Sequence, residues 1–276
     1  MMNTRHWMAL AIVAVLVAAM VVACSRGDSE NRLVVTGSST VAPLVSVIAK
    51  RYEAKHPGVR IDVQMGGSSR GLADARRGLA DIGMMSRGLK AGENDVEAVA
   101  IARDGICLIV HKDNPVEGLT DEQLVAIYKG EIANWKDVGG ADAPITVVNK
   151  AEGRSTLELF VAHFDLENPQ IKAHVVVGDN EQGIQTVAGN PNSIGYVSIG
   201  TAEYDATHGV AIKLLAVGGV TPSVENVKLG KFPLSRPLNL VTAGETTPLA
   251  DDFIAFARSQ AVHDLVEKQY FVPIAP

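Results

Sequence analysis

Three turns rich in serine, threonine and glycine constrain the fold of this chain more than any other feature. Each stands between a strand-like run and a helix-like run, at residues 37–43, 66–71 and 152–156. A helix that starts directly after such a turn presents free backbone N–H groups and the positive end of its dipole, and the hydroxyls add donors. One turn of this kind is ordinarily only a helix cap. Three of them predict a site for an anion such as phosphate or sulfate.

Strand-like and helix-like runs alternate along the chain, which predicts the α/β class with a largely parallel sheet. The first series ends near residues 113–115, where we place a boundary, and a capping box at residues 120–123 opens the next helix. Strands are expected at 33–36, 59–65, 81–85, 96–102, 106–111, 145–149, 173–177, 193–199, 211–217 and 236–241. Helices are expected at 41–56, 72–79, 120–128, 155–164, 181–188, 248–258 and 262–270.

Two α/β series that both carry anion-type turns predict two lobes that face a cleft. All three turns follow strands, and ligands of open α/β sheets bind beyond the carboxyl ends of the strands. We expect the chain to cross between the lobes near residues 111–115 and 219–235. Hinge closure around the ligand is the expected motion.

The N-terminus has the pattern of an export signal. Arg5 and His6 precede an apolar run of 14 residues, 9–22, and Cys24 follows the small residue Ala23. This pattern resembles a lipobox, so we predict a signal peptide at 1–23 and a lipid-anchored tether at 24–31, with Cys24 acylated. The alternative is a short transmembrane anchor, but spanning a bilayer takes about 18–20 residues.

The charge and the cysteines narrow the function further. The chain has no basic tract of the kind that binds nucleic acid. Because its net charge is −6, an anion has to be held by local dipoles and one or two buried cations. Once the signal is cleaved before Cys24, Cys107 is the only other cysteine, in an apolar run typical of a core strand. No disulfide, metal or cofactor is expected.

Several motifs together resemble the phosphate-binding proteins of ABC importers. They are residues 37–44, 81–89, 134–137, 193–197, 235–238 and 270–273, and the resemblance covers nearly all of the chain from Leu33 onward. It implies a type II periplasmic-binding-protein fold, with a discontinuous first lobe at 32–112 plus 233–276 and a second lobe at 113–232. It also implies that the protein is a monomer and is not an enzyme. It would bind inorganic phosphate, pass it to the membrane subunits of an importer, and face the periplasm or the cell exterior.

The resemblance also implies a set of ligand-binding residues. They are Ser39, Thr40, Ser68, Ser86, Arg87, Lys150, Arg154, Ser155 and Thr156. Many family members carry Asp where this chain has Ser86. That Asp accepts a hydrogen bond from protonated phosphate and repels fully deprotonated anions such as sulfate. We therefore expect weaker discrimination between phosphate and sulfate here.

The position of each cation in the sequence favours contact with the ligand to a different degree. Arg154 at a helix start opposes the dipole, which favours a role as an anion partner. Arg87 suits either the ligand or a pair with Glu93, and Lys150 suits either the ligand or solvent.

Other functions remain open at this point. Residues 67–71 match the Gly-x-Ser-x-Gly elbow of a serine hydrolase, with Ser69 as nucleophile. His163, His208 or His263 would have to act as the base. A binding protein for sulfate, molybdate, tungstate or a phosphonate, or a phosphate sensor without a transporter, would fit the same turns.

Overall fold

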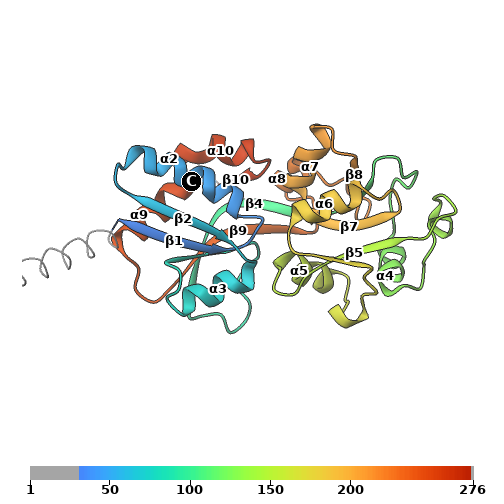
Figure 1. Ribbon diagram of the computed structural model, residues 1–276, viewed down its shortest axis with the longest axis horizontal. Helices are drawn as coiled ribbons and strands as arrows, with labels where there is room; N and C mark the ends of the chain where they lie inside the picture. The colour runs from blue at the N-terminus through green and yellow to red at the C-terminus, as the bar shows by residue number, and fades with distance from the viewer. Residues whose placement is uncertain (1–30, 275–276) are drawn as a thin grey trace, which may run out of the picture.

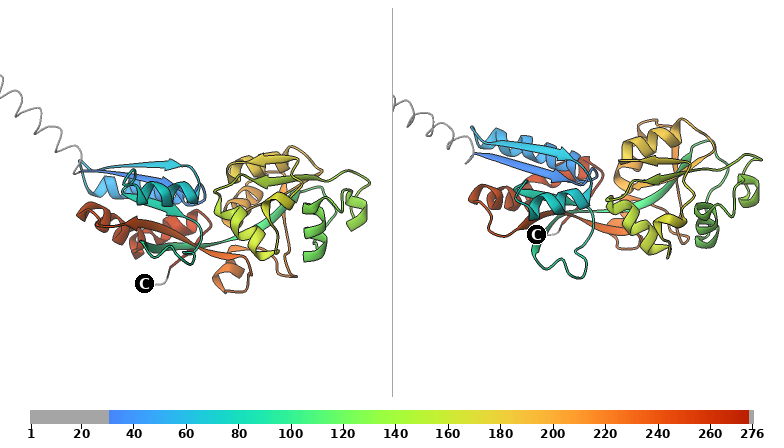
Figure 2. Two further views of the ribbon diagram at one scale, coloured as in Figure 1. Left: turned by 90° about the horizontal axis from the view of Figure 1, so that it is seen from below. Right: turned by 60° about the horizontal axis from the view of Figure 1, so that its bottom comes forward.

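Two lobes lie side by side along the long axis of the molecule, and strands β4 (Val96–His111) and β9 (Ser235–Ala243) run between them (Figure 1). The computed structural model describes residues 31–274. Its strands follow the order β2-β1-β3-β9-β4-β7-β5-β6, and β8 and β10 each pair with β4. The lobes stay separate in two further views (Figure 2). The two-lobed α/β fold predicted from the sequence is confirmed.

The first lobe is a mixed sheet with helices on both faces. Strands β1, β2 and β3 pair in parallel, and β9 joins β3 and β4 antiparallel. Helices α2, α9 and α10 share one buried cluster with β1, β3 and β9, and α3 covers the other face through Leu72. The bounds are β1 Arg32–Gly37, α2 Ala42–Lys55, β2 Arg60–Met65, α3 Ser68–Arg76, β3 Ile82–Met85, β9 Ser235–Ala243, α9 Pro248–Arg258, α10 His263–Lys268 and β10 Val272–Pro273.

The second lobe is built around β7, which lies between β5 and β4, while β6 forms the outer edge beyond β5. Its largest buried side chains include Trp135, Tyr128, Tyr196 and Phe160, and the rings of Phe160 and Tyr196 stack at 3.9 Å between centroids. The bounds are α4 Asp121–Lys129, β5 Thr146–Lys150, α5 Ser155–His163, β6 Val175–Val177, α6 Asn180–Ala188, β7 Ser193–Ser198, α7 Ile199–Thr207, β8 Ile212–Leu215 and α8 Val224–Lys228. Short 3-10 helices lie at Trp135–Val138, Asn168–Gln170 and Gln260–Val262.

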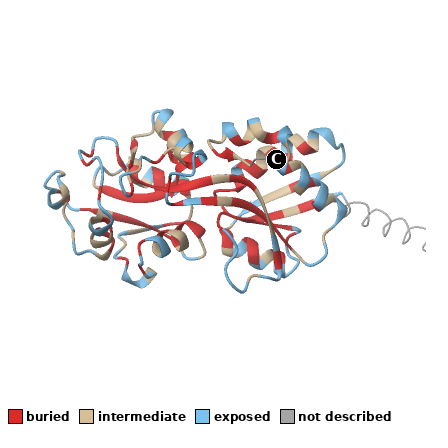
Figure 3. Ribbon diagram, turned by 180° about the vertical axis from the view of Figure 1, so that it is seen from behind, coloured by how far each residue is buried: buried red, intermediate tan, exposed pale blue. Residues whose placement is uncertain are grey.

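Local signals explain where several helices begin. The predicted capping box is present at α4: the Thr120 hydroxyl accepts from the Gln123 N–H, and the Gln123 side chain accepts from the Thr120 N–H. Helix α2 buries Leu44, Val45 and Ile48, which lie on one face at helical spacing. Figure 3 shows the result, with buried strands through the middle of both lobes and exposed residues on loops and outer helix faces.

A single long strand, β4 (Val96–His111), passes through both lobes. It pairs with β9 up to Gly105↔Ser235 and with β7 from Ile106↔Ser198 onward. The N–H of Ile106 also donates to the carbonyl of Leu234 at 3.0 Å. Both passages of the chain between the lobes therefore lie next to each other.

The prediction of two separate strands, 96–102 and 106–111, with the crossing at 111–115, is wrong. The charged residues between the two apolar runs do not end the strand, because Asp104 pairs with Arg236 on the neighbouring strand at 2.9 Å. The small residue Gly105 lets the second lobe pack closely: a Cβ there would lie 2.6 Å from the Ile199 side chain. The lobe limits 32–112 plus 233–276 and 113–232 stay a prediction, with one adjustment, since Ile106–Val110 belong to the second lobe's buried cluster.

The described residues also bear on membrane insertion and on the cysteines. Within residues 31–274, no helix combines the length and apolar character that a membrane span requires. Cys107 is buried in β4, as predicted for a core residue, and burial raises the pKa of its thiol well above the ordinary value. The predicted signal peptide, the predicted acylation site Cys24 and the predicted tether up to residue 30 lie outside the described residues.

Candidate anion-binding site

The helices that follow the three predicted turns begin without a capping side chain. The residues before α2, α3 and α5 are Val41, Gly67 and Arg154, and none of them caps its helix. By contrast, side chains cap five other described helices, α4, α6, α7, α8 and α9. The start of α5 thus keeps its N–H groups available for an anion. At α2 the N–H groups of Thr40, Val41 and Ala42 donate to Ser38, and at α3 that of Ser69 donates to the carbonyl of Gly153.

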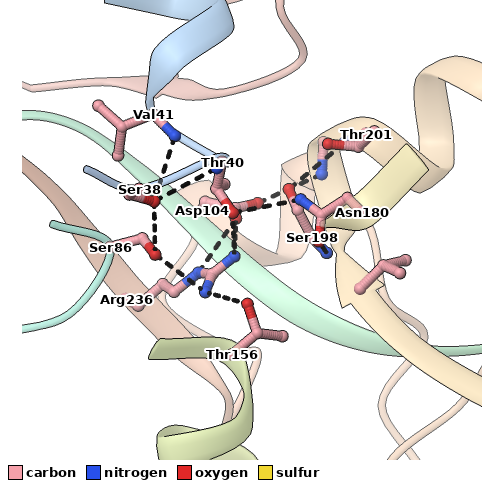
Figure 4. Close-up of polar contacts among 12 residues, drawn as sticks. Ser38, Thr40, Val41, Ser86, Asp104, Thr156, Asn180, Ser198, Thr201 and Arg236 are labelled. Atoms are coloured by element: carbon pink, nitrogen blue, oxygen red, sulfur yellow. Dashed lines mark hydrogen bonds and ion pairs between the residues drawn. The ribbon is translucent and has the colours of Figure 1, made fainter. Parts of the chain in front are cut away.

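Hydroxyl groups from the first lobe gather at these helix starts. The Ser38 hydroxyl donates to the Ser86 hydroxyl at 3.0 Å (Figure 4). The N–H of Ser86 donates to the Ser68 hydroxyl at 3.2 Å. All three residues are buried. The structure thus brings Ser68 and Ser86 together as predicted, but Ser38 takes the inward place expected of Ser39. Ser39 is half-buried and lines a cavity of about 480 Å³ beside the site.

The second lobe adds the start of α5. Ser155 is 2% exposed, and its hydroxyl has no hydrogen-bond partner among the described residues. The buried Thr156 hydroxyl accepts from Arg236 at 3.0 Å, which leaves its own proton free to donate. A buried donor without an acceptor is costly, so Ser155 favours a ligand oxygen at this position.

Arg236 is the central cation of the site, and it was not among the residues predicted to bind the ligand. Its guanidinium is bonded to Asp104 by both Nε (3.2 Å) and an NH2 nitrogen (2.9 Å). The remaining donors reach Thr156, Ser86 and Thr40, so that one side chain contacts hydroxyls of both lobes (Figure 4). Asp104 in turn accepts from the N–H of Gly200 at 3.2 Å. The pair therefore fixes the guanidinium in place at the passage between the lobes.

The sequence carried a weak signal for this pair. Asp104 interrupts an apolar strand and Arg236 stands at the start of another, and a charge buried in a strand is normally paired. Asn180 was also missed; its amide donates to the Thr40 hydroxyl at 3.2 Å across the two lobes. Nothing in its local sequence separates it from an ordinary residue at a helix start.

Arg87 lies next to the site but is held by carboxylates. Its two terminal nitrogens donate to Glu93, each at 2.8 Å, and Nε lies 3.0 Å from Glu158. The guanidinium hydrogen bond lowers the pKa of Glu93 to about 2. Of the two roles open for Arg87, the structure shows the pair with Glu93. This geometry does not support the predicted contact with the ligand, because the carboxylates of Glu93 and Glu158 already neutralise the charge of Arg87.

Lys150 and Arg154 lie at the second-lobe side of the site. Lys150 is 3% exposed at the end of β5, and its ammonium donates to the backbone carbonyl of Asp179. Arg154 is half-buried between the first-lobe turn at Gly67 and the second-lobe turn at Gly178. Among the described residues, the Arg154 side chain has no hydrogen bond or ion pair, so its charge is available to an anion. Ligand contact by both residues stays a prediction.

Lys150→Met is expected to remove a pH dependence of stability. Burial lowers the pKa of Lys150 to about 7, whereas in the unfolded chain it is about 10.4. Between these values the unfolded state binds more protons, so the free energy of unfolding of the native protein rises with pH. From pH 7 to 9 this rise is about 2 kcal/mol.

Urea unfolding of both proteins at pH 7 and pH 9 measures the difference. The control is Lys112→Met, which removes an exposed lysine and should keep the native slope. The same pH slope in Lys150→Met as in the native protein would contradict the assignment.

The hydrolase alternative is wrong, because Ser69 is not arranged as a nucleophile. Its hydroxyl donates to Glu158 at 3.1 Å, and its N–H donates to the carbonyl of Gly153 at 3.2 Å. In residues 31–274, no histidine is hydrogen-bonded to Ser69. Nor does any group of three or more His, Cys, Asp or Glu side chains in that range have the placement to hold a metal ion.

Hydrogen-bond donors suited to an anion gather between two α/β lobes, and two adjacent strands connect these lobes. This arrangement defines a two-lobed ligand-binding protein. A family model of the PBP superfamily domain matches residues 25–261. The phosphate-binding protein PstS of Bacillus subtilis is 28% identical over 257 residues, which cover 91% of this chain and 84% of that protein.

Two solved structures are similar over most of the chain. A phosphate ABC transporter substrate-binding protein from Clostridium perfringens, with bound phosphate, is 34% identical, with a TM-score of 0.82, and the match covers 89% of this chain and 100% of that one. An ABC-type phosphate transport receptor from Vibrio cholerae is 31% identical, with a TM-score of 0.73, over 88% of this chain and 100% of that one. The chain belongs to the PBP superfamily and, within it, to the phosphate-binding proteins of ABC importers. The family predicted from the sequence is thus confirmed, and the protein is not an enzyme.

Proposed function

We propose that this protein captures inorganic phosphate outside the cytoplasm and delivers it to the membrane subunits of an ABC importer. The observation that carries the proposal is the buried guanidinium of Arg236 between the lobes, which contacts hydroxyls at the starts of α2 and α5 and the Ser86 hydroxyl. Ser86 in turn accepts from the Ser38 hydroxyl and donates its N–H to Ser68 at the start of α3. Tetrahedral oxyanions suit a planar guanidinium that presents parallel donors. Membership in the family supports phosphate as the anion.

The phosphate would lie between the hydroxyls of both lobes. Ser38, Thr40, Ser68 and Ser86 would donate from the first lobe, and Ser155 and Thr156 from the second, with Arg236 and Arg154 as the countercharge. Because Asp104 neutralises part of the Arg236 charge, backbone dipoles and hydroxyls have to supply much of the remaining stabilisation. Ser86 takes part in this cluster with a hydroxyl, which donates as well as accepts, so it presents no fixed negative charge to sulfate.

We also propose the export and anchoring expected from the sequence. Residues 1–23 would be the signal peptide, and acylated Cys24 with the tether 24–31 would hold the monomer at the outer side of a membrane. Lobe closure around phosphate would present the complex to the importer. The mass of the mature N-terminal peptide tests the acylation.

Thr156→Ala is expected to weaken phosphate binding about tenfold to a hundredfold, since a hydrogen bond to a charged group contributes roughly 1.5–3 kcal/mol. Calorimetric titration of purified protein, stripped of bound anions, at pH 6–8 measures the affinity. Thr221→Ala is the control, because Thr221 is exposed in the loop before α8 and, within residues 31–274, its side chain makes no hydrogen bond.

The same titration decides between phosphate and the alternative anions. Native protein that fails to bind phosphate would overturn the assignment. Tighter binding of sulfate, molybdate, tungstate or a phosphonate than of phosphate would move the function to that anion.

A further inference from the structure

Glu158 on α5 is surrounded by partners from the opposite lobe. Its carboxylate lies 3.0 Å from Nε of Arg87 and 2.6 Å from Nζ of Lys90, and it accepts from the Ser69 hydroxyl at 3.1 Å. Arg87 and Lys90 belong to the loop after β3, and Ser69 belongs to α3. All three partners are therefore in the first lobe, whereas Glu158 belongs to the second.

The charges of this group balance only when the lobes are together. The first lobe contributes two cations, Arg87 and Lys90, and one carboxylate, Glu93, which is bonded to Arg87. Glu158 supplies the second carboxylate from across the cleft. When the lobes separate, the first lobe keeps an excess positive charge and the second lobe keeps the opposing negative charge, so the group favours closure.

Burial makes this attraction stronger than that of an ordinary surface pair. The side chains of Arg87 and Glu158 are 4% and 22% exposed, and only Lys90, at 55%, lies largely in solvent. The N–H of Ser69 adds a bond to the carbonyl of Gly153 beside them. These contacts sit next to Ser86 in the first lobe and to Ser155 and Thr156 in the second, so they close the same turns that would hold the anion.

We infer that Glu158 is a positioning residue that latches the lobes together through Arg87 and Lys90 and thereby sets how slowly the bound anion leaves. The inference rests on the proposed phosphate capture, since release of phosphate is its functional readout. It assigns no phosphate contact to Arg87: that side chain acts on the ligand through Glu158.

The test compares Glu158→Gln with Glu152→Gln. Both remove one negative charge from the second lobe near the site, but Glu152 accepts only from Asn168 within its own lobe. Stopped-flow release of phosphate should be about five- to tenfold faster in Glu158→Gln, since a partly buried ion pair contributes on the order of 1 kcal/mol. The effect is expected in the release rate because most changes at an interface act on dissociation. Release in Glu152→Gln should stay within about twofold of the native rate, because this variant keeps all contacts of Glu158.

A double-mutant cycle with Lys90→Ala identifies the partner. Coupling between the two substitutions supports the latch, whereas release at the native rate in Glu158→Gln, or fully additive effects in the cycle, overturns it. Small-angle scattering without phosphate gives a second readout: Glu158→Gln should have the larger radius of gyration, and an unchanged radius counts against the latch. Because scattering needs no ligand, failure of phosphate to bind the native protein would be recognised separately.

Discussion

Arg236→Ala is expected to weaken phosphate binding by at least a hundredfold. The residue is 2% exposed, and its side chain contacts Ser86, Thr156 and Thr40, so its loss removes donors that reach both lobes. It also leaves Asp104 buried without a counterion. A hydrogen bond to a charged group contributes roughly 1.5–3 kcal/mol, so the loss of two such bonds to phosphate corresponds to a factor of more than a hundred. An incoming dianion would meet an unpaired carboxylate.

Titration calorimetry on folded protein measures this effect, and circular dichroism and thermal unfolding establish that the variant folds. Arg258→Ala, which removes an exposed arginine at the end of α9, is the matched control and should bind as the native protein does. Arg236→Lys should fall between the two, because lysine keeps the charge but lacks the planar fork that reaches Asp104 and the hydroxyls together. Binding by Arg236→Ala within tenfold of the native affinity would refute the central role of this residue.

Gly37→Ala is expected to lower the melting temperature by about 10 °C, the largest effect on stability that we expect from a single methyl group in this protein. Gly37 ends β1 with φ +135°, and a Cβ there would lie 2.3 Å from the Met84 carbonyl oxygen and 3.0 Å from Cα of Gly71. Both neighbours are backbone atoms of packed elements, so they can move only if β3 and α3 shift. Backbone strain and overpacking together cost about 3–5 kcal/mol. The same shift would displace the turn that carries Ser38 and Thr40.

Gly58→Ala provides the matched comparison for the thermal melts. Gly58 also has a positive φ, +93°, but a Cβ there meets no atom within 4 Å. That variant should therefore show only the conformational cost of about 1 kcal/mol. Equal losses of melting temperature in the two variants would show that crowding against β3 and α3 does not matter.

Helix periodicity, helix capping and turn residues in the sequence correctly identified several elements of the fold. The helix spacing of Val41–Tyr52 and the capping box at Thr120 both predicted helices that the structure contains. Serine and glycine turns between strand and helix patterns marked the starts of α2 and α5, because capping and turn preferences act within a few residues. Helix α3 begins at Ser68, inside the turn at 66–71, and not at the predicted residue 72. The two-lobed class followed from the order of these elements, supported by the family resemblance.

Contacts between distant segments produced the errors and omissions. Asp104 and Arg236 are 132 residues apart, and their bond is what lets β4 continue through a charged interruption. Arg87 was open to two roles in the sequence, and only the positions of Glu93 and Glu158 in space decide between them. Ser38 and Ser39 are adjacent and chemically equal, so only the path of the backbone decides which hydroxyl turns inward.

The sequence by itself thus determined the α/β class, most of the element order and the turns that we propose hold the anion, since periodicity, capping and glycine placement depend on neighbours in the chain. Helices α7 (Ile199–Thr207) and α8 (Val224–Lys228) were not predicted. The tertiary structure alone decided that Arg236 is the central cation, that Asp104 holds it, and that Glu158 meets cations of the opposite lobe. Charge pairing acts through space over a few ångströms, whatever the separation along the chain, so no local pattern specifies it.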